Sequence, residues 1–305
     1  MPTTRFAPSP TGLLHLGHAH SALFAFQQAK GGRFLLRIED IDHTRCRPEF
    51  DAAALEDLHW LGLRWDPPVR RQSNHLDSYT IALQQLEADG LLYPCFCTRR
   101  DIEAEIARAG SAPQGPDGPV YPGVCRALDA TTRAVWRQEG RPHAWRLAMD
   151  RAVARATQAA GPLRFYERSR GWVLAEPAVF GDVVLARKDI RTSYHLAVTL
   201  DDALQGVEVV TRGEDLLPAT HIHRLLQALL KLPVPEWHHH GLIRDQTGRR
   251  LAKRDGARAL ADLRAQGLTA PEVRALAGFG EIDLNHSPSP SGAAQQPGDD
   301  SGGDR

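Results

Sequence analysis

The chain has 305 residues, of which 42% are hydrophobic and 24% charged, a composition typical of a globular protein with a sizeable core. Its 37 basic and 37 acidic side chains balance, which excludes a general nucleic-acid coat, so a nucleic acid would have to meet a local basic patch. The sequence shows no secretory signal and no apolar run of membrane-spanning length, and we expect a cytoplasmic protein of one large or two ordinary domains.

The first predicted unit runs from a short strand at Arg5 through a loop into a helix. The prolines and the glycine within Ala7–Gly12 exclude regular structure from that loop. The segment from Ala19 to Lys30 is rich in alanine, leucine, phenylalanine and glutamine, and it predicts a helix that ends at Gly31-Gly32.

Two histidines, His15 and His18, stand on either side of Gly17 where this helix begins. Backbone amides and the helix dipole attract anions at such a place, phosphates above all. The alternative is a strand–loop–helix corner with surface histidines, and the local pattern does not decide between the two.

Strand and helix patterns alternate over the rest of residues 1–92. The segment Phe34–Glu39 predicts a buried strand, which leads into the acidic loop Asp40–Asp42. A second helix is expected from Leu76 to Asp89. Such alternation predicts a parallel sheet with helices packed on it. Between these segments Pro48 suits the first turn of a helix, whose apolar face is Phe50, Ala54, Leu55 and Leu58.

The composition changes after Tyr93-Pro94, where a segment rich in glycine and proline begins. Three of the four cysteines fall within it, at Cys95, Cys97 and Cys125. Disulfides are rare in the cytosol, so this close spacing favours a metal site, and three thiolates suffice for zinc if a fourth ligand exists. Three buried free thiols are the alternative. Cys46 has no partner by spacing and is expected to be an ordinary side chain.

Residues 126–170 carry a local excess of positive charge, with ten arginines against four acidic residues. This composition suits a nucleic-acid strand, and it equally suits a solvated face with a few core aromatic residues. The aromatic residues of this part of the chain are Trp136, Trp145, Phe165, Tyr166 and Trp172.

The strand and helix pattern resumes near residue 193. We expect strands over Tyr194–Leu200 and Val207–Thr211, with Asp201-Asp202 after the first of them, and a helix over Thr220–Leu230. The chain is therefore predicted to be an α/β protein whose parallel sheet is interrupted by an inserted domain and then completed.

The end of the ordered chain is predicted to hold two short helices, over Leu260–Gln266 and Pro271–Ala277. Beyond them the sequence is polar, without an apolar face, and is expected to be disordered. The expected divisions are 1–93 and 191–258 for the two halves of the sheet domain, 94–190 for the insertion, 259–284 for the helical segment and 285–305 for the tail.

A basic stretch, Gly248–Asp255, follows the strand-like residues Gly241–Arg244. Basic loops are usually only solvated, but together with two histidines at a helix start Lys253 suits stabilisation of charge on a leaving pyrophosphate. The preceding run His238–His240 is expected to be extended, so only two of its rings share a face. We interpret that run as core or surface histidines and not as a metal site.

Four separated blocks of the sequence resemble the class I aminoacyl-tRNA synthetases in their glutamyl form. The blocks occur in the family's order over residues 4–258, which implies a Rossmann-like catalytic domain that makes an aminoacyl adenylate. They are Phe6–Gly12 with His15–His18, Arg37–Asp42, the segment from Tyr194 onward, and Arg212–Leu216.

The lysine motif departs from the usual family form, Lys-Met-Ser-Lys-Ser. Arg250 stands for the first lysine and Ala252 for the central serine, whereas Lys253 keeps the second lysine. The resemblance therefore still implies the pyrophosphate role of Lys253 but not a serine hydroxyl contact to the nucleotide.

Residues beyond 258 are too few for the helical anticodon-binding domain of full glutamyl-tRNA synthetases, so the chain resembles their stand-alone paralogues, the glutamyl-Q tRNA(Asp) synthetases. This resemblance implies activation of L-glutamate with ATP and without tRNA. The glutamyl group then passes to queuosine at the wobble position of tRNA(Asp). The implied partners are ATP, glutamate and the queuosine-carrying anticodon loop, met by a monomer, with Mg²⁺ on the ATP phosphates and the arginines of 126–170 on the tRNA.

The resemblance also assigns the substrate-binding residues. In the glutamate pocket, the guanidinium groups of Arg5 and Arg212 are assigned to the side-chain carboxylate and Glu39 to the α-ammonium. The residues that line the pocket are Ala7, Ser9 and Tyr194. The ATP-binding residues are His15, Gly17, His18 and Lys253, and all of them except Gly17 are also assigned as catalytic. One structural Zn²⁺ is assigned to Cys95, Cys97, Tyr121 and Cys125, with His143 as the alternative fourth ligand.

Two other functions stay open at this point. One is a truncated glutamyl-tRNA synthetase that charges the 3′ end of tRNA, and glutamate activation without any tRNA would argue against it. The other is a non-catalytic, zinc-containing RNA-binding module, which the presence of Arg5, Glu39, His15 and His18 argues against.

Overall fold

Three parallel strands organise the amino-terminal part of the chain, as the alternation of strand and helix predicts. They are β1 (Thr4–Phe6), β2 (Phe34–Ile38) and β3 (Asp66–Arg71), in the order β1-β2-β3, with Thr4 opposite Phe34. The crossover helices are α1 (Leu16–Ala29) and α2 (Pro48–Trp60). The computed structural model describes residues 1–108, 113–243, 258–280, 282 and 284.

Helix α1 forms where its composition predicts it. His15 is its N-cap, and Lys30 closes it in the left-handed conformation with φ of 49°. Its buried face, which includes Leu23 and Phe26, packs on the sheet and on the carboxyl-terminal helices α9 (Leu260–Ala265) and α10 (Ala270–Leu276). These last two helices confirm the prediction for that part of the chain, while the expected tail from 285 lies outside the described residues.

A second sheet continues the first one. Its order is β11-β12-β8-β9, in which β11 (Val209–Gly213), β12 (Glu236–His240) and β8 (Arg164–Glu167) are parallel and β9 (Gly171–Leu174) is antiparallel. The amides of Glu208 and Val209 donate to the carbonyl of Thr3, 3.0 and 3.1 Å away, so β11 lies beside β1. The carboxyl ends of β1, β2, β11 and β12 therefore meet at one edge, where ligands of open parallel sheets bind.

The helices on this second sheet are α7 (Tyr194–Leu204) and α8 (Ala219–Leu229). They share a core with α3 (Leu76–Ala88) and α6 (Met149–Ala160). Helices α2, α3 and α8 and strands β2 and β11 confirm the elements predicted for those segments.

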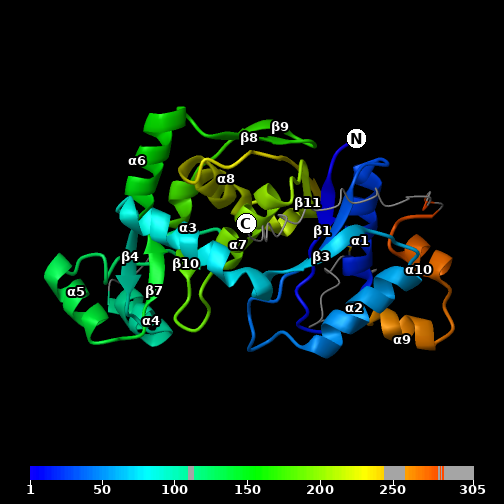
Figure 1. The fold of residues 1–305 in the computed structure, drawn as a ribbon, viewed down its shortest axis with the longest axis horizontal. Helices are drawn as coiled ribbons and strands as arrows, with labels where there is room; N and C mark the ends of the chain where they lie inside the picture. Colours follow the sequence, from blue (N-terminus) through cyan, green and yellow to red (C-terminus); the bar gives the residue numbers. More distant parts are fainter. Residues whose placement is uncertain (109–112, 244–257, 281, 283, 285–305) are drawn as a thin grey trace, which may run out of the picture.

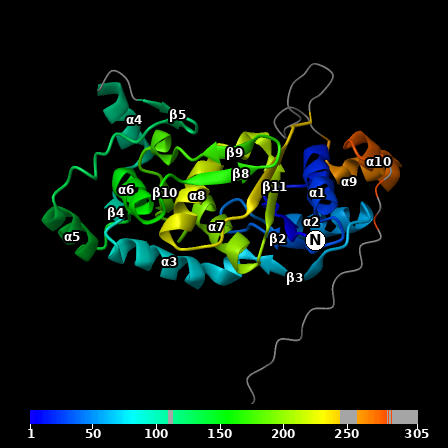
Figure 2. The ribbon, with the colours of Figure 1, turned by 90° about the horizontal axis from the view of Figure 1, so that it is seen from above.

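The segment between the two sheets has its own small antiparallel sheet, of order β10-β7-β4. Figures 1 and 2 show this part at the opposite end of the molecule from α9 and α10. In the described part of the chain, 3₁₀ turns occur at Gln72–His75, at Pro177–Phe180 just before β10, and at Glu214–Leu216. The elements of the segment are β4 (Leu92–Cys95), α4 (Arg99–Arg108), β5 (Gln114–Gly115), β6 (Gly118–Pro119), α5 (Ala130–Gln138), β7 (Ala144–Leu147) and β10 (Val184–Ala186).

The strand predicted over Tyr194–Leu200 is wrong, because this segment begins helix α7. The Ser193 hydroxyl caps the helix by accepting from the amide of Leu196, 3.4 Å away. Burial is nearly continuous along the helix, and a continuous apolar run does not distinguish a buried strand from a buried helix. Asp201 and Asp202 consequently lie within the last turns of α7 and not in a loop.

The strand-like reading of residues 241–244 is also wrong over 241–243, and Arg244 lies outside the described residues. The strand there is β12, which ends at His240, and Gly241, Leu242 and Ile243 follow it in an irregular conformation. The histidine run is extended, as predicted, and its rings alternate between the two faces of the sheet. His240 packs against His20 with ring centroids 4.6 Å apart, while His239 points to the other face. Within the described residues, no helix is both long and apolar enough to cross a bilayer.

Candidate functional site

A buried arginine lies at the shared edge of the strands. Arg212, near the end of β11, donates to Tyr194 Oη at 3.0 Å and to Thr220 Oγ1 at 2.7 Å. It also donates to His239 Nε2 at 3.1 Å and to His223 Nδ1 at 3.2 Å. All four acceptors are neutral groups, and no ion pair joins Arg212 to a carboxylate among the described residues.

The histidines around Arg212 are held neutral. Burial, followed by the charge of Arg212, lowers the pKa of His195 and of His239 to about 4. The same causes lower the pKa of His223, which is also bonded to His195 at 3.3 Å. A buried cation surrounded by neutral groups keeps a net positive charge, and that charge favours an anionic ligand.

Behind Arg212 a carboxylate fixes the orientation of one of these rings. Glu167, at the end of β8, is fully buried and lies 2.5 Å from His239 Nδ1. It also accepts from the His239 amide at 3.1 Å and from Ser169 Oγ at 2.9 Å. Despite its burial, these hydrogen bonds keep the pKa of Glu167 below its usual value. His239 therefore donates from Nδ1 to Glu167 and accepts at Nε2 from Arg212.

A second charged cluster lies at the ends of β1 and β2. Arg5 Nε and Arg37 Nη1 both donate to Asp202 Oδ1 at 2.8 Å. Arg5 also donates to the Thr211 carbonyl at 2.9 Å, which ties β1 to β11. Glu39 receives one bond, from Arg37 at 3.2 Å, and its burial raises its pKa. The cluster contains two cations and two anions, and one carboxylate oxygen of Glu39 accepts no hydrogen bond from another described residue.

Tyr194 connects the two groups. Its hydroxyl is bonded to Arg212, and its pKa, which burial raises, also responds to the charges of Arg212, Glu39 and Arg5. Three of the residues expected in the glutamate pocket, Arg5, Glu39 and Arg212, thus lie around this ring. Ser9 is exposed and Ala7 half-buried in the loop after β1, and the amide of Glu39 anchors that loop by donating to the Pro8 carbonyl at 2.9 Å.

The two histidines at the start of α1 form a reciprocal cap. His15 Nδ1 accepts from the Gly17 amide and His18 Nδ1 accepts from the His15 amide, each at 3.1 Å. The ring centroids lie 3.8 Å apart. The amides of His18 and Ala19 donate to the His15 carbonyl. These four backbone amides, which the sequence suggested as phosphate donors, are thus bonded within the helix start. The imidazole rings, and not these amides, are the groups that could contact a phosphate here.

The residue expected to act on pyrophosphate, Lys253, lies outside the described residues, as do Arg250 and Ala252. The residues that flank this stretch are described. Ile243 follows β12 closely, and Ala259 pairs with His15 in an isolated bridge. The two flanking residues thus lie close to the candidate site, one after the end of β12 and the other at the start of α1.

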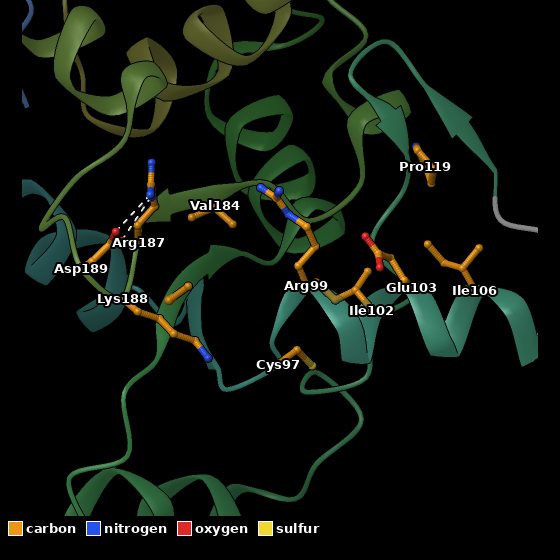
Figure 3. Close-up of a pocket in the computed structure, with 11 residues that line it drawn as sticks. Cys97, Arg99, Ile102, Glu103, Ile106, Pro119, Val184, Arg187, Lys188 and Asp189 are labelled. Carbon is orange, nitrogen blue, oxygen red and sulfur yellow. Dashed lines mark hydrogen bonds and ion pairs between the residues drawn. The ribbon is translucent and has the colours of Figure 1, made fainter. Parts of the chain in front are cut away.

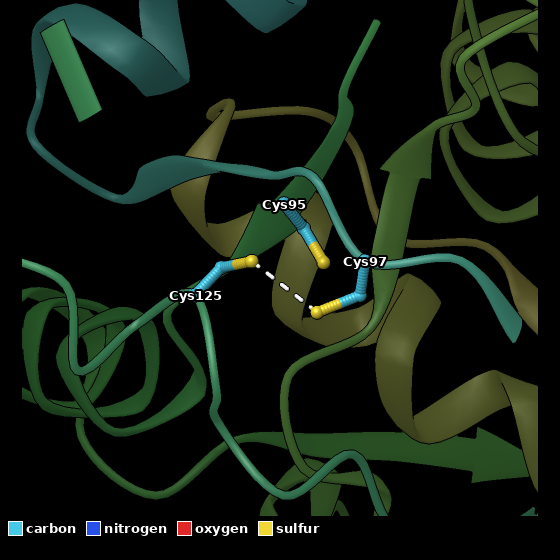
Figure 4. A group of neighbouring side chains, drawn as sticks. All are labelled: Cys95, Cys97 and Cys125. Atoms are coloured by element: carbon cyan, nitrogen blue, oxygen red, sulfur yellow. Dashed lines mark hydrogen bonds between the residues drawn. The ribbon is translucent and has the colours of Figure 1, made fainter. Parts of the chain in front are cut away.

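The three cysteines predicted to bind metal converge in the inserted segment, as Figure 4 shows. Their sulfur atoms all lie within 4.8 Å of one another, with Cys97 Sγ and Cys125 Sγ 3.3 Å apart. Tyr121 Oη lies 3.4 Å from Cys95 Sγ and 3.5 Å from Cys97 Sγ. His143 is not part of the group that could hold a metal among the described residues, and its Nδ1 lies 3.0 Å from the Arg141 carbonyl.

The donor set fits a closed tetrahedral site. Zinc–sulfur bonds of about 2.3 Å separate the sulfurs of such a site by about 3.8 Å, so Cys97 Sγ and Cys125 Sγ would need to move only slightly apart to admit the ion. A hydrogen bond from Cys125 lowers the pKa of Cys95 to about 4. Burial raises the pKa of Tyr121, so its phenol would lose its proton only to a metal.

A cavity of about 670 Å³ lies beside this cluster, between α4 and β10 (Figure 3). Arg99, Ile102 and Ile106 of α4 line it together with Cys97, and Arg187, Lys188 and Asp189 border it from the loop after β10. It shares no residue with the Arg212 group. We therefore do not take it as the substrate site.

Sequence reasoning missed several residues that hold this site together. Only a contact across the fold identifies them, because none belongs to a motif that carries chemistry by spacing. For the histidine run, the available signal was the position of His239 in β12, directly opposite Arg212 in the neighbouring strand β11. The missed residues are Glu167, Asp202, Thr220, His223 and His239.

Known proteins are similar to this chain in sequence and in fold. Residues 2–280 match the family model described as tRNA synthetases class I (E and Q), catalytic domain. The chain is 53% identical over 292 residues to the glutamyl-Q tRNA(Asp) synthetase of Rhodobacter capsulatus, covering 90% of this chain and 99% of that protein. It is 46% identical over 274 residues to that of Nocardia farcinica, covering 89% and 82%. A solved glutamate tRNA ligase from Elizabethkingia meningosepticum, in complex with its amino acid, is similar with a TM-score of 0.69 and 30% identity, over 84% of this chain and 52% of that one.

Proposed function

The chain belongs to the class I glutamyl and glutaminyl tRNA synthetases, among the glutamyl-Q tRNA(Asp) synthetases, and we propose that it activates L-glutamate with ATP and passes the glutamyl group to queuosine in tRNA(Asp). The observation that carries the proposal is the buried charge of Arg212, which has no carboxylate partner among the described residues. A substrate carboxylate would supply that partner.

Glutamate recognition divides between the two charged groups. Arg212 takes the side-chain carboxylate, and Arg5 adds charge from the neighbouring strand, although Asp202 already binds part of its guanidinium. Glu39 takes the α-ammonium with the oxygen that Arg37 leaves free. Ala7, Ser9 and Tyr194 line the space between, so that an α-amino dicarboxylic acid is held at both ends.

Adenylate formation then requires positioning and charge stabilisation, and no side-chain nucleophile. A carboxylate oxygen of glutamate attacks the α-phosphorus of ATP, and the bond to the β-phosphate oxygen breaks to release pyrophosphate. His15 and His18 contact the phosphates, next to Gly17, and Lys253 stabilises the departing group. When bound with ATP, Mg²⁺ supplies further charge neutralisation on the phosphates.

In the second step, a hydroxyl of the queuosine cyclopentenediol attacks the glutamyl carbonyl. The bond to the adenylate phosphate oxygen breaks, AMP leaves and the hydroxyl proton is lost. We place this reaction in the cytoplasm and assign it to a monomer, which light scattering of the purified chain tests.

We assign one structural Zn²⁺ to an inserted domain of residues 94–190, between catalytic halves 1–93 and 191–258. Cys95, Cys97, Tyr121 and Cys125 would complete its four ligands. The metal would tie β4 to the loop that precedes α5, and it would have no open position for substrate.

The experiment that tests the function uses radiolabelled glutamate, ATP and tRNA(Asp) with or without queuosine. We expect glutamate-dependent ATP–pyrophosphate exchange without tRNA, and labelling of only the queuosine-containing tRNA. Labelling that ignores queuosine would overturn the acceptor and favour charging of a tRNA 3′ end. Absence of exchange would overturn adenylate chemistry itself.

A further inference from the structure

The ten arginines of residues 126–170 do not form one basic surface. They lie on α5, β7, α6 and β8 and in the turns beside these elements, and Figure 1 shows the four elements in separate places. Four of them are neutralised by carboxylates: Arg126 by Asp150 and Asp182, Arg137 by Glu87, Arg141 by Glu139 and Arg168 by Glu236.

Two of the tryptophans in this part of the chain are also occupied. The guanidinium of Arg137 lies 4.8 Å from the ring centroid of Trp145, and that of Arg141 lies 4.5 Å from Trp136. Such cation–π contacts already cover these rings. They are therefore poor candidates for stacking on a nucleobase.

The hairpin of β8 and β9 differs, because its outer face combines exposed aromatic surface with unpaired arginine. Tyr166 and Trp172 are cross-strand neighbours with ring centroids 5.4 Å apart, and Trp172 is 70% exposed. The exposed residues Arg164 and Arg170 lie at the two ends of this face, and neither makes an ion pair with a described residue. Leu174, opposite Arg164, adds exposed apolar surface.

The inner face of the same hairpin reaches the candidate active site. Glu167 of β8 is bonded to His239, which in turn accepts from Arg212. The positive charge of Arg170, three residues after Glu167, contributes to lowering the pKa of His239. The hairpin turn is thus near the glutamate pocket, while its outer face is turned toward solvent.

We propose that this outer face, made of Arg164, Tyr166, Arg170, Trp172 and Leu174, is the surface on which the tRNA substrate docks. This inference rests on the proposed function. Unpaired guanidinium groups meet the phosphates, and an exposed indole stacks on an unpaired base, which is the combination used for single-stranded nucleic acid. A loop held there is next to the pocket in which the adenylate forms. A purely apolar partner would leave the arginines without counter-charge.

The test compares Trp172→Ala and Arg170→Ala with the unchanged chain in binding of queuosine-containing tRNA(Asp), measured by filter binding at several salt concentrations. Loss of one stacked base weakens binding about 5- to 100-fold. Loss of one phosphate contact reduces the slope of log K against log salt by about 1. Glutamate-dependent ATP–pyrophosphate exchange without tRNA should be unchanged in Trp172→Ala, because this residue touches none of the glutamate or ATP groups.

Matched controls come from the same chain. Arg155→Ala removes an exposed arginine of α6 that has no aromatic neighbour in the described contacts, and Ile81→Ala removes an apolar side chain that is 65% exposed on α3. Both should bind tRNA normally.

The possible outcomes separate the two proposals. Normal tRNA binding by both hairpin variants overturns the docking surface while leaving the proposed function intact. The docking surface is also overturned if the unchanged chain is a dimer and Trp172→Ala dissociates it without changing the affinity for tRNA, because this face would then bind a second copy of the chain. Failure of pyrophosphate exchange in the unchanged chain refutes the proposed function instead.

Discussion

Replacement of Arg212 by glutamine tests the glutamate site most directly. The guanidinium donates to His239, Tyr194, His223 and Thr220, all of them neutral, so its charge is available to a substrate anion. Removal of one partner of a buried ion pair costs about 3–5 kcal/mol. Since about 1.4 kcal/mol corresponds to a factor of ten, the KM for glutamate should rise by roughly 100- to 4,000-fold.

The assay is glutamate-dependent ATP–pyrophosphate exchange in the absence of tRNA. The KM for ATP should change little, because Arg212 has no assigned contact with the nucleotide. Arg212→Lys keeps the charge but loses the planar fork, so we expect an intermediate rise in the glutamate KM. Tyr194→Phe removes one acceptor and leaves the cation in place, and it should have the smallest effect.

Glutamine, offered as an alternative substrate, separates a charge effect from a general disturbance. The variant Arg212→Gln should lose much of the preference for glutamate over glutamine, because the amide has no charge for Arg212 to pair. An unchanged KM for glutamate, or an equal loss with both substrates, would refute the assignment of the side-chain carboxylate to Arg212.

Four further predictions concern stability, metal and pyrophosphate. Asp202→Asn should lower the free energy of unfolding by about 3–5 kcal/mol in urea denaturation, because the carboxylate pairs two buried arginines; a loss below about 1 kcal/mol would contradict this. The pKa of His195 is lowered to about 4 in the folded chain, so on acidification the unfolded chain takes up a proton at this ring before the folded chain does. The free energy of unfolding should therefore fall as the pH drops from about 6.5 to about 4. In urea denaturation, His195→Asn should make the midpoint depend less on pH over this range. The purified chain should contain one zinc per molecule by mass spectrometry, and Cys97→Ala should lose the metal and melt at lower temperature, whereas an equal metal content would exclude these ligands. Lys253→Ala should reduce pyrophosphate exchange by orders of magnitude, and wild-type exchange would refute its assigned role.

Most elements could be predicted from local patterns. Pro48 at the first turn of α2 and the glycine pair after α1 mark helix boundaries within a few residues. The prediction failed at Tyr194–Leu200, because helix α7 is buried along nearly its whole length and its apolar run has no clear period. The strand expected just after the histidine run was misplaced, because three consecutive histidines do not resemble a buried strand until their partners are known, and β12 ends at His240.

By itself, the sequence determined the order of the motifs and therefore the family, because residues such as His15, His18 and Glu39 stand within short contiguous blocks. The spacing of Cys95, Cys97 and Cys125 alone also indicated these residues as candidate metal ligands. Only the tertiary structure decided how Arg212 is held, since Glu167 and His239 reach it from two other strands. Hydrogen bonds between side chains far apart in the chain have no local signal, because each depends on strand order and register, which the whole fold sets.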